Sequence, residues 1–296
     1  MMKNPSKTLI SFIMAVMLLA LACIAAGCAG NPKAPASSDN AASQIGHAAP
    51  KDSAYGVFLS YDGELSALSA YDCIVIDAQY HSAEEIADFK AGGHTVYSYI
   101  NIGSLEDFRD YYADYADLAL GNYEHWDEEV WVDVSARKWQ DFILEQLAPS
   151  LASKGIDGFF VDNCDVYYCY PTAEILEGAS KIMKGLRATG LKVIINGGDA
   201  FMTAYTSSGG AWSDVITGIN QETVFSKINW DSDTFSAADA DDREYFSEYI
   251  EKYAALGADI YLLEYTTDEK LKAAIRDYCH EHGFYYYIAD SLELGI

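Results

Sequence analysis

Metal-binding patterns of cysteine and histidine are absent from this sequence of 296 residues. There is no CxxC pair and no HxxxH or HExxH motif, so neither a structural nor a catalytic zinc site is expected. No GxGxxG or phosphate-binding loop follows the first predicted strand, and the chain has no nucleotide-binding signature. We therefore expect no cofactor and no bound metal.

Basic residues are also scarce. The chain has 19 Lys and Arg against 45 Asp and Glu, which gives a net charge of −26. Because binding to a phosphate backbone needs clustered Lys and Arg, nucleic acid is not expected as a partner. A strongly negative surface suits a cationic substrate, although many secreted proteins are acidic merely for solubility.

The N-terminus has the pattern of an export signal. Lys3 and Lys7 give a basic start, residues 9–24 are almost wholly apolar, and the small residues Ala-Ala-Gly follow before Cys28. This order is typical of a secretory signal with a lipobox-like end, at which Cys28 would become the lipidated N-terminus. An uncleaved membrane anchor and cleavage by ordinary signal peptidase are the alternatives.

The sequence divides into three parts. Residues 1–27 are the predicted lipoprotein signal peptide, residues 28–53 are a predicted flexible tether rich in Ala, Ser, Pro and Asn, and residues 54–296 are long enough for one domain. We expect a protein of the bacterial cell surface that is held at the membrane by its lipid anchor only. In such an oxidising compartment, Cys164 and Cys169 are close enough in sequence to form a disulfide.

Eight short apolar segments alternate with helical patterns in the predicted domain. The segments are 55–61, 73–76, 95–101, 159–161, 192–195, 215–220, 259–263 and 284–288. Eight strands that alternate with helices predict a closed (β/α)8 TIM barrel of the α/β class. The last helix is missing, and we expect a loop or the segment before residue 55 to replace it. An open doubly wound sheet is disfavoured, because the dinucleotide-binding glycines are absent.

Polar residues follow the carboxyl ends of these strands. They are Asp77, Asn101, Asp162, Asp165, Asn196, Glu222, Glu264 and Asp290. Closure of the barrel gathers them around one mouth, where a ring of carboxylates and amides resembles the floor of a sugar-binding site. Buried carboxylates are costly to desolvate, so a functional role is favoured over the alternative that Asp162 caps a helix and Asp165 is solvated.

Glycoside cleavage is the chemistry that this arrangement favours, because it needs one protonated and one ionised carboxyl group on opposite sides of the scissile bond. Asp162 and Glu222 are the best pair, since they end the fourth and sixth strands. A separation of about 5–5.5 Å favours retention of configuration, and about 6.5–9.5 Å favours inversion. Tyr99, Tyr167 and Tyr265 would offer ring faces to a sugar, although many of the 23 tyrosines are ordinary wall residues.

Four motifs make the sequence resemble one enzyme family. They are Tyr99-x-Asn101-x-Gly103-Ser104, Trp131-Val132-Asp133, Gly155-Ile156-Asp157-Gly158 followed by Asp162-x-x-Asp165-x-Tyr167, and Gln221-Glu222. Over residues 55–290 they resemble the endo-α-1,4-polygalactosaminidase family of glycoside hydrolases. That family includes barrel proteins labelled as related to cysteinyl-tRNA synthetase. A synthetase is not expected here, because the chain has no nucleotide-binding signature.

The resemblance implies a retaining endo-hydrolase of α-1,4-linked, partly deacetylated galactosamine polymers of biofilms. Asp162 would be the nucleophile and Glu222 the general acid/base. Asp77, Asp165, Asn196 and Glu264 would position the sugar. Further candidate substrate-binding residues are Tyr99, Asn101, Tyr167 and Tyr265. Two features depart from the family: the loop after Asp162 contains two cysteines, and residues 104–129 form an acidic, tyrosine-rich insertion.

Two other classes of function remain open. A lipid-anchored carbohydrate-binding protein, or an inactive hydrolase homologue, would bind the polymer without turnover. A metal-dependent deacetylase or amidohydrolase would need a cluster of metal ligands, and His280-x-His282 is the only close histidine pair in the sequence.

Overall fold

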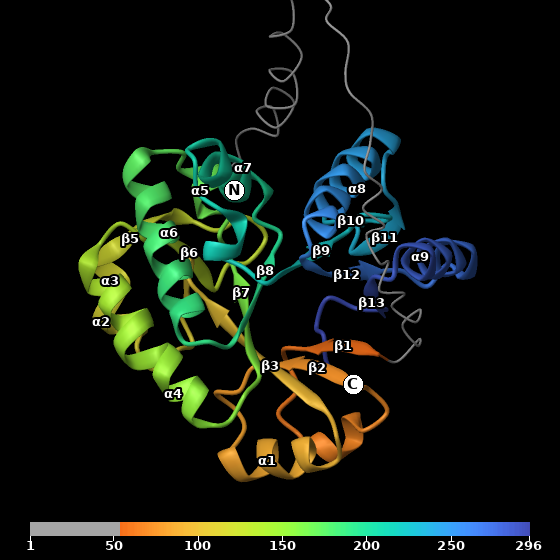
Figure 1. The fold of residues 1–296 in the computed structure, drawn as a ribbon, viewed down its shortest axis with the longest axis horizontal. Helices are drawn as coiled ribbons and strands as arrows, with labels where there is room; N and C mark the ends of the chain where they lie inside the picture. Colours follow the sequence, from red (N-terminus) through yellow and green to blue (C-terminus); the bar gives the residue numbers. More distant parts are fainter. Residues whose placement is uncertain (1–53) are drawn as a thin grey trace, which may run out of the picture. The chain divides into compact units, whose positions relative to one another are not determined.

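Residues 54–296, the part of the chain that this computed structural model describes, are built on a barrel of eight parallel strands (Figure 1). The strands are β1 (Tyr55–Phe58), β2 (Cys73–Ile76), β3 (Thr95–Asn101), β7 (Gly158–Asp162), β8 (Lys192–Asn196), β9 (Gly218–Glu222), β12 (Asp259–Tyr265) and β13 (Tyr285–Ala289). They follow one another around the sheet in chain order, and each neighbouring pair is parallel. The predicted (β/α)8 fold is confirmed.

The barrel is nearly closed between its first and last strands. β1 and β13 are the two edges of the hydrogen-bonded sheet, and Phe58 of β1 packs against Tyr287 of β13 with ring centroids 5.3 Å apart. After β13, residues 290–296 form a loop without a helix. The backbone N–H of Ser60 donates to the carbonyl oxygen of Leu294 (3.4 Å), so this loop lies against the turn that follows β1. A loop therefore stands where a complete (β/α)8 barrel has its last helix.

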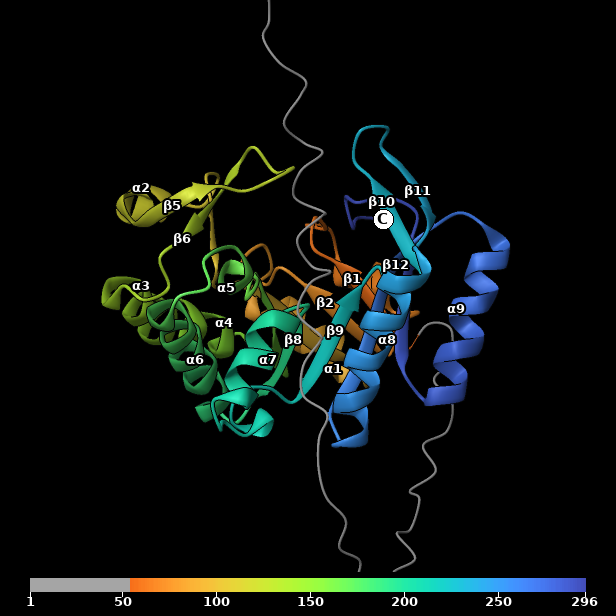
Figure 2. The same ribbon diagram turned by 90° about the horizontal axis from the view of Figure 1, so that it is seen from above.

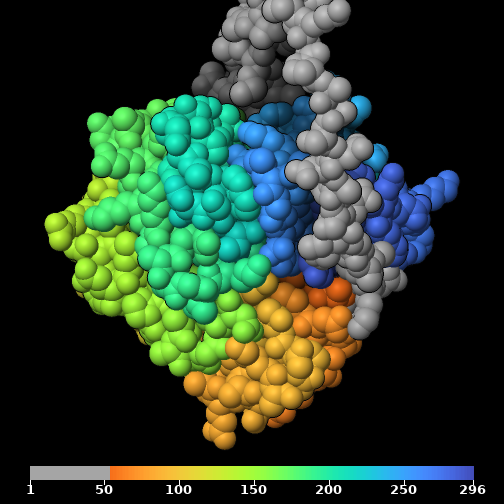
Figure 3. All heavy atoms as spheres, in the orientation of Figure 1, coloured from red at the N-terminus to blue at the C-terminus, as the bar shows by residue number. Residues whose placement is uncertain are grey.

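Helices form the outer layer of the barrel. They are α1 (Ala83–Ala91), α3 (Arg137–Phe142), α4 (Ala148–Ser153), α6 (Ala173–Ala188), α7 (Asp199–Ser207), α8 (Ala240–Ala255) and α9 (Glu269–His282), with the single turn α5 (Val166–Cys169) after β7. A π-helical stretch at Ile143–Leu147 joins α3 to α4. In the space-filling view, the green, teal and blue segments that carry α6, α7 and α8 form a continuous surface over the strands (Figure 3).

The ends of these helices follow local sequence signals. Ser82 and Glu85 form a capping box at the start of α1, in which the Ser82 side chain accepts from the Glu85 backbone N–H and the Glu85 carboxylate accepts from the Ser82 N–H. α9 begins after Asp268, whose side chain accepts from two backbone N–H groups, and ends at Gly283 with φ of 72°. A left-handed residue at this position favours glycine, which has no Cβ to clash.

Two insertions leave the barrel on the same side, beyond the carboxyl ends of the strands (Figure 2). The first, between β3 and α3, is a three-stranded antiparallel sheet of β4 (Ser104–Glu106), β5 (Ala119–Asn122) and β6 (Glu129–Val132), with the short helix α2 (Tyr112–Tyr115). The second is the hairpin of β10 (Ser226–Asn229) and β11 (Thr234–Ala237). Their tips meet, because the His125 ring stacks on Trp230 with centroids 4.4 Å apart and planes 2° from parallel.

Aromatic side chains fill the barrel interior. Tyr55, Tyr97, Phe160 and Tyr261 are buried there, on the strand face opposite to the one that packs on the helices. The rings of Tyr55 and Tyr261 lie 4.8 Å apart. Strand residues are thus buried on both faces, as expected for a parallel barrel, and the mouth at the carboxyl ends is the part left open for a ligand.

Some of the sequence predictions concern residues before residue 54, and one prediction within residues 54–296 is wrong. The predicted signal peptide, the lipidated Cys28 and the tether lie outside the described residues. No helix within residues 54–296 is both long enough and apolar enough to cross a membrane. The suggested disulfide is not formed: Cys164 is a buried free thiol with its sulfur 3.8 Å from that of Met183, and Cys169 is exposed.

Candidate active site

A cleft of about 750 Å³ lies at the carboxyl ends of the barrel strands, bordered by both insertions and by the C-terminal loop. Its walls are strongly acidic. The carboxylates that line it are Asp62, Asp77, Glu106, Glu128, Glu129, Asp162, Asp165, Asp199, Glu222 and Glu293. Among the lining residues of the described chain, only Arg109 is basic. The cleft therefore attracts cations and repels anions.

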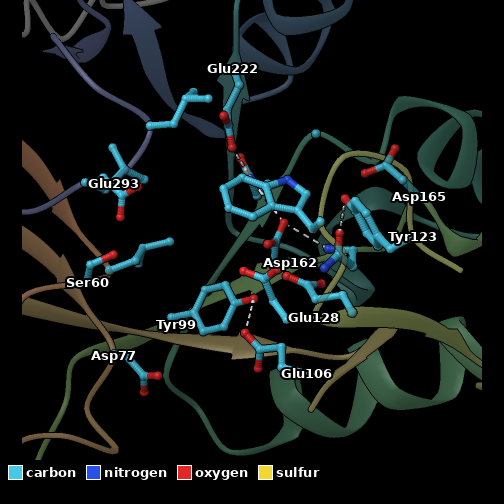
Figure 4. A pocket seen from close by; sticks show the side chains of 18 of the residues that line it. Ser60, Asp77, Tyr99, Glu106, Tyr123, Glu128, Asp162, Asp165, Glu222 and Glu293 are labelled. Carbon is cyan, nitrogen blue, oxygen red and sulfur yellow. Dashed lines mark hydrogen bonds between the residues drawn. The ribbon is translucent and has the colours of Figure 1, made fainter. Parts of the chain in front are cut away.

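Asp162 and Glu222 lie together in this cleft, as the strand positions predicted. Asp162 ends β7 and Glu222 ends β9, and β8 between them ends in Asn196. The single amide nitrogen of Asn196 donates to both carboxylates, to Asp162 Oδ1 at 3.0 Å and to Glu222 Oε1 at 2.7 Å. Figure 4 shows the two carboxyl groups pointing into the pocket, with Asp77 on one side of them and Asp165 on the other.

The surroundings of this pair raise both pKa values and partly oppose the rise. Burial, and then the charge of Glu222, raise the pKa of Asp162 to about 6, while hydrogen bonds from Asn196, the Asn163 backbone and Tyr99 lower it. Burial also raises the pKa of Glu222, against hydrogen bonds from Asn196 and from the Tyr265 hydroxyl (2.8 Å). Two carboxyls this close titrate as a coupled pair. Both shifts favour a protonated carboxyl in this pair, and acid–base catalysis at a glycosidic bond requires one protonated and one ionised carboxyl group.

The turn after Asp162 is tight and tied to the first insertion. Asn163 has a positive φ of 64°, accepts a hydrogen bond from the Tyr123 hydroxyl (2.9 Å) and donates one to Ser104 Oγ (3.1 Å). Gly103 allows this approach, because a Cβ there would stand 1.7 Å from the Asn163 carbonyl oxygen. The Asn-x-Gly-Ser motif after β3 thus fixes the backbone that presents Asp162.

The sequence did not single out Glu129, which also lines the cleft. Glu129 begins β6, accepts a hydrogen bond from the Ser104 hydroxyl, and has a pKa of about 7 because burial raises it. No alternation of polar and apolar residues marks Glu129, which is the last of three consecutive acids directly before Val130 and Trp131. Asp165, which was predicted, also has a pKa of about 7, raised by burial and then by the charges of Asp199 and Asp162.

An internal ion-pair cluster forms one end of the cleft. Arg109 donates to Asp77 Oδ2 (2.6 Å) and to Glu106 Oε2 (2.6 Å), and all three side chains are almost fully buried. The other Asp77 oxygen accepts from the Gln79 backbone N–H (2.9 Å). Asp77 and Glu106 therefore neutralise the charge of Arg109, and Asp77 both lines the cleft and stabilises its wall through this ion pair.

The structure brings seven of the predicted site residues to the cleft wall and leaves three outside it. The seven are Asp77, Tyr99, Asp162, Asp165, Asn196, Glu222 and Tyr265. Asn101 is buried behind the wall and donates to the Tyr99 hydroxyl (3.0 Å) and to Ser104 Oγ (2.7 Å). Tyr167 packs against the core from α5. Asn101 therefore supports the site without lining it, whereas Tyr167 belongs to the packing of the core.

Glu264 requires a correction. It is fully buried, and its carboxylate accepts hydrogen bonds from the backbone N–H groups of Phe225 (3.0 Å) and Ser226 (2.8 Å) and from the Ser226 hydroxyl. Its side chain leaves β12 on the face opposite to the barrel interior, so it fixes the root of the β10–β11 hairpin instead of binding a sugar. Asp290, the last of the strand-end acids, is exposed and also outside the cleft.

Metal-ligating side chains are not grouped in the described residues: no cluster of three or more His, Cys, Asp or Glu is placed to hold an ion. His280 and His282, the pair behind the deacetylase alternative, lie at the end of α9 and are not part of the cleft wall. The geometry therefore gives that alternative no site.

A (β/α)8 barrel whose open mouth holds two coupled carboxylates in an acidic, tyrosine-lined cleft defines the class of the protein as a glycoside hydrolase. No curated protein sequence matches the chain. Its sequence does match the profile of glycoside-hydrolase family GH114 over residues 35–292. The chain belongs to this family, and the predicted kinship with endo-α-1,4-polygalactosaminidases is confirmed.

Solved structures agree on the fold. The glycoside hydrolase domain of PelA from Pseudomonas aeruginosa is 18% identical, with a TM-score of 0.68 over 82% of this chain and 96% of that one. Ega3 from Aspergillus fumigatus, solved in complex with galactosamine, is 16% identical, with a TM-score of 0.64 over 87% and 96% of the two chains. An α-galactosidase from Thermus thermophilus has a TM-score of 0.51 at 9% identity, covering 84% of this chain and 59% of its own.

Proposed function

We propose that this protein is an endo-acting, retaining hydrolase of α-1,4-linked polymers of galactosamine and N-acetylgalactosamine. One observation carries the mechanism: the Asn196 amide nitrogen donates to both Asp162 and Glu222. Two oxygens that contact one nitrogen at hydrogen-bond distance lie less than about 6 Å apart, which supports the separation of about 5–5.5 Å found in retaining enzymes over the about 6.5–9.5 Å of inverting ones.

In the proposed reaction Asp162 is the nucleophile. Its carboxylate attacks the anomeric carbon while Glu222 donates a proton to the glycosidic oxygen, so the C–O bond breaks and a glycosyl ester forms on Asp162. Glu222, now ionised, then takes a proton from a water molecule that attacks the same carbon and releases Asp162. Asn196 and the Tyr265 hydroxyl hold the two carboxyls in place through both steps.

The charge of the cleft supports a cationic substrate. A deacetylated galactosamine unit carries an ammonium group, and the cleft offers it many carboxylates. Within residues 54–296, Arg109 is the only basic residue of the cleft wall, and it is already paired with Asp77 and Glu106. The exposed rings of Tyr80, Phe108 and Trp230 at the rim add apolar faces for sugar rings and cation–π contact for amino groups. Ega3 in complex with galactosamine, a protein of the same fold, is consistent with this choice.

The test is hydrolysis of partly deacetylated galactosaminan, followed by reducing-end release, mass spectrometry of the products and NMR of the first-formed anomer. We expect oligomers whose new reducing ends are initially α. Asp162→Ala and Glu222→Gln should each lower the rate by several orders of magnitude, while Asp290→Ala, a strand-end acid outside the cleft, should act as the wild type does. Wild-type rates in both cleft variants would refute the assignment.

The alternative is a carbohydrate-binding protein or inactive homologue. It predicts that the wild type binds the polymer with no new reducing ends, and that Asp162→Asn leaves the affinity unchanged. The pair of buried carboxyls favours the enzyme, because carboxyl groups whose pKa values are raised by burial inside a cleft are typical of catalytic sites.

We further propose that the enzyme acts at the bacterial cell surface, with a lipid on Cys28 and residues 28–53 as tether. The support is the sequence pattern of residues 1–28. Intact-mass measurement of the membrane-extracted protein should show a diacylglycerol on Cys28, and Cys28→Ser should lose it. An unmodified wild-type mass would sink the proposal.

A further inference from the structure

Buried polar side chains form a hydrogen-bonded chain from the barrel interior to the two carboxylates. The Tyr55 hydroxyl of β1 donates to Asn220 Oδ1 (3.1 Å), and Asn220 Nδ2 of β9 donates to Asn196 Oδ1 (2.7 Å). Asn196 Nδ2 then donates to Asp162 and Glu222. Tyr55 and Asn220 are 1% and 0% exposed, and neither is part of the cleft wall, so neither can touch a substrate.

The strand register builds this chain. β8 and β9 pair with Asn196 opposite Asn220, which places the two amides side by side at the carboxyl end of the barrel. β9 and β12 pair with Asn220 opposite Tyr261, whose ring packs on Tyr55 at 4.8 Å. The phenol of β1 therefore reaches across the interior to β9, and packing holds it there.

Asn196 can hold both carboxylates only if its amide NH₂ group, and not its amide oxygen, points toward them. An amide has a donor end and an acceptor end, and carboxylates can only accept. Because Asn220 donates to the acceptor end, the donor end must point to Asp162 and Glu222. With the amide reversed, its oxygen would stand against two carboxylates while the two amide nitrogens faced each other.

From this geometry we propose that Asn220 and Tyr55 are positioning residues for the hydrolysis: they hold the Asn196 amide with its NH₂ toward Asp162 and Glu222 and so keep the two carboxyls in reactive alignment. The inference rests on the proposed function for its catalytic meaning, although the hydrogen-bond chain itself does not. During the reaction Asp162 becomes an ester and Glu222 gains and loses a proton, so the strength of the hydrogen bonds from the Asn196 amide to these two groups changes. The Asn220 donor does not change, and it preserves the arrangement through each step.

The effect is measurable as a titration. Loss of an aligned donor disfavours the ionised carboxylate, because a hydrogen bond to the charged form stabilises that form and lowers the pKa. The other titratable groups that act on Asp162 are Glu106, Glu129, Cys164, Asp165, Glu222, Tyr99, Tyr123 and Tyr265. They come from the surrounding strands and loops, and the variants below alter none of them.

The experiment compares Asn220→Leu and Tyr55→Phe with the control Tyr97→Phe. Tyr97 is also buried in the barrel interior, but its hydroxyl bonds to that of Tyr261 and has no link to Asn196. The first measurement is the pKa of Asp162 from carboxyl ¹³C NMR of the substrate-free protein, assigned with Asp162→Asn. The second is the pH dependence of kcat/KM on galactosaminan, with kcat and KM separated and folding checked by Tm.

We expect an upward shift of the Asp162 pKa and of the acid limb by about one unit in Asn220→Leu, a smaller shift in Tyr55→Phe and none in Tyr97→Phe. The loss should fall on kcat, with KM unchanged. An unshifted pKa in folded Asn220→Leu, or an equal shift in Tyr97→Phe, overturns the inference. If Asn220→Leu does not fold, Tyr55→Phe decides. A wild type that leaves galactosaminan intact refutes the proposed function, while the NMR comparison still decides the chain.

Discussion

Replacing Glu264 by glutamine is expected to make the stability of the domain less dependent on pH. Glu264 is fully buried, and burial raises its pKa to about 7, against hydrogen bonds from Ser226 and the neighbouring backbone that lower it. In the unfolded chain a glutamic acid titrates near about 4.3. The folded state therefore binds this proton more tightly. Its contribution to stability is fully present below about pH 4 and is lost as the pH rises through about 7.

The magnitude follows from the two pKa values. Between pH 5 and pH 8 a shift from about 4.3 to about 7 changes the free energy of unfolding by on the order of 2–3 kcal/mol. For a domain of this size, 1 kcal/mol moves Tm by about 2–4 °C, so Glu264 alone lowers Tm by roughly 5–10 °C over this range. Asp165 and Glu129, with pKa values of about 7, act in the same direction. The comparison of wild type with Glu264→Gln isolates one group.

The assay is thermal unfolding of both proteins from pH 5 to pH 8 at constant ionic strength. The amide resembles the protonated carboxyl, so Glu264→Gln should be close to the wild type at pH 5 and fall less by pH 8. Glu269→Gln is the control, because that carboxylate is 77% exposed and water screens its charge. A wild-type-to-variant difference that stays constant with pH would refute the reasoning. A KM for the polymer that is higher in Glu264→Gln than in the wild type would show that Glu264 contributes to sugar binding.

Three further outcomes are expected. kcat/KM should have a bell-shaped pH profile. It should fall on the acid side as the pH drops through about 6, where Asp162 gains a proton, and fall on the alkaline side, where Glu222 loses its proton. A kcat/KM that is flat from pH 4 to 8 would contradict the assigned roles. Asp77→Ala removes one partner of the buried Arg109 and should lower the free energy of unfolding by about 2 kcal/mol in denaturant titration. Trp230→Ala removes the ring stack on His125 that joins the two insertions, so KM for the polymer should rise several-fold while Tm stays nearly unchanged. An unchanged KM would show that the rim does not contact the substrate.

The barrel was readable from the sequence because its strands are buried on both faces and end in abrupt polarity. The strand predicted at 95–101 has those bounds in the structure, and the rule that strand ends gather at one mouth located Asp162, Asn196 and Glu222. The strand predicted at 215–220 instead begins at Gly218, because Val215 and Ile216 are buried in a turn that follows a short 3₁₀ helix. Apolar residues marked burial there, and burial alone does not distinguish a strand from a packed turn.

The insertions were beyond sequence reasoning for a different reason. The first contains strands of three and four residues whose pairing is set by contacts between segments distant in the chain, as where Ser104 pairs with Trp131. In the sequence, the glycine pair Gly197-Gly198 before α7 indicates a loop. Both have positive φ, of 61° and 70°, and the helix begins directly after them. Glu106, Arg109 and Glu129 became part of the site only through this long-range pairing.

Strand parity decides which strand-end acid enters the cleft. In the register of β9 and β12, Glu222 lies opposite Leu263, and both side chains face the barrel interior. Glu264 is one residue further along, so it faces the helices and is used to anchor a hairpin. Tyr265 returns to the interior, where its hydroxyl reaches Glu222. A shift of one position along a strand thus turns a side chain from the barrel interior, where it can contact a sugar, to the outer face, where it can only anchor neighbouring structure. Sequence patterns fix the last residue of a strand least well, so they do not decide which of the two faces a strand-end acid occupies.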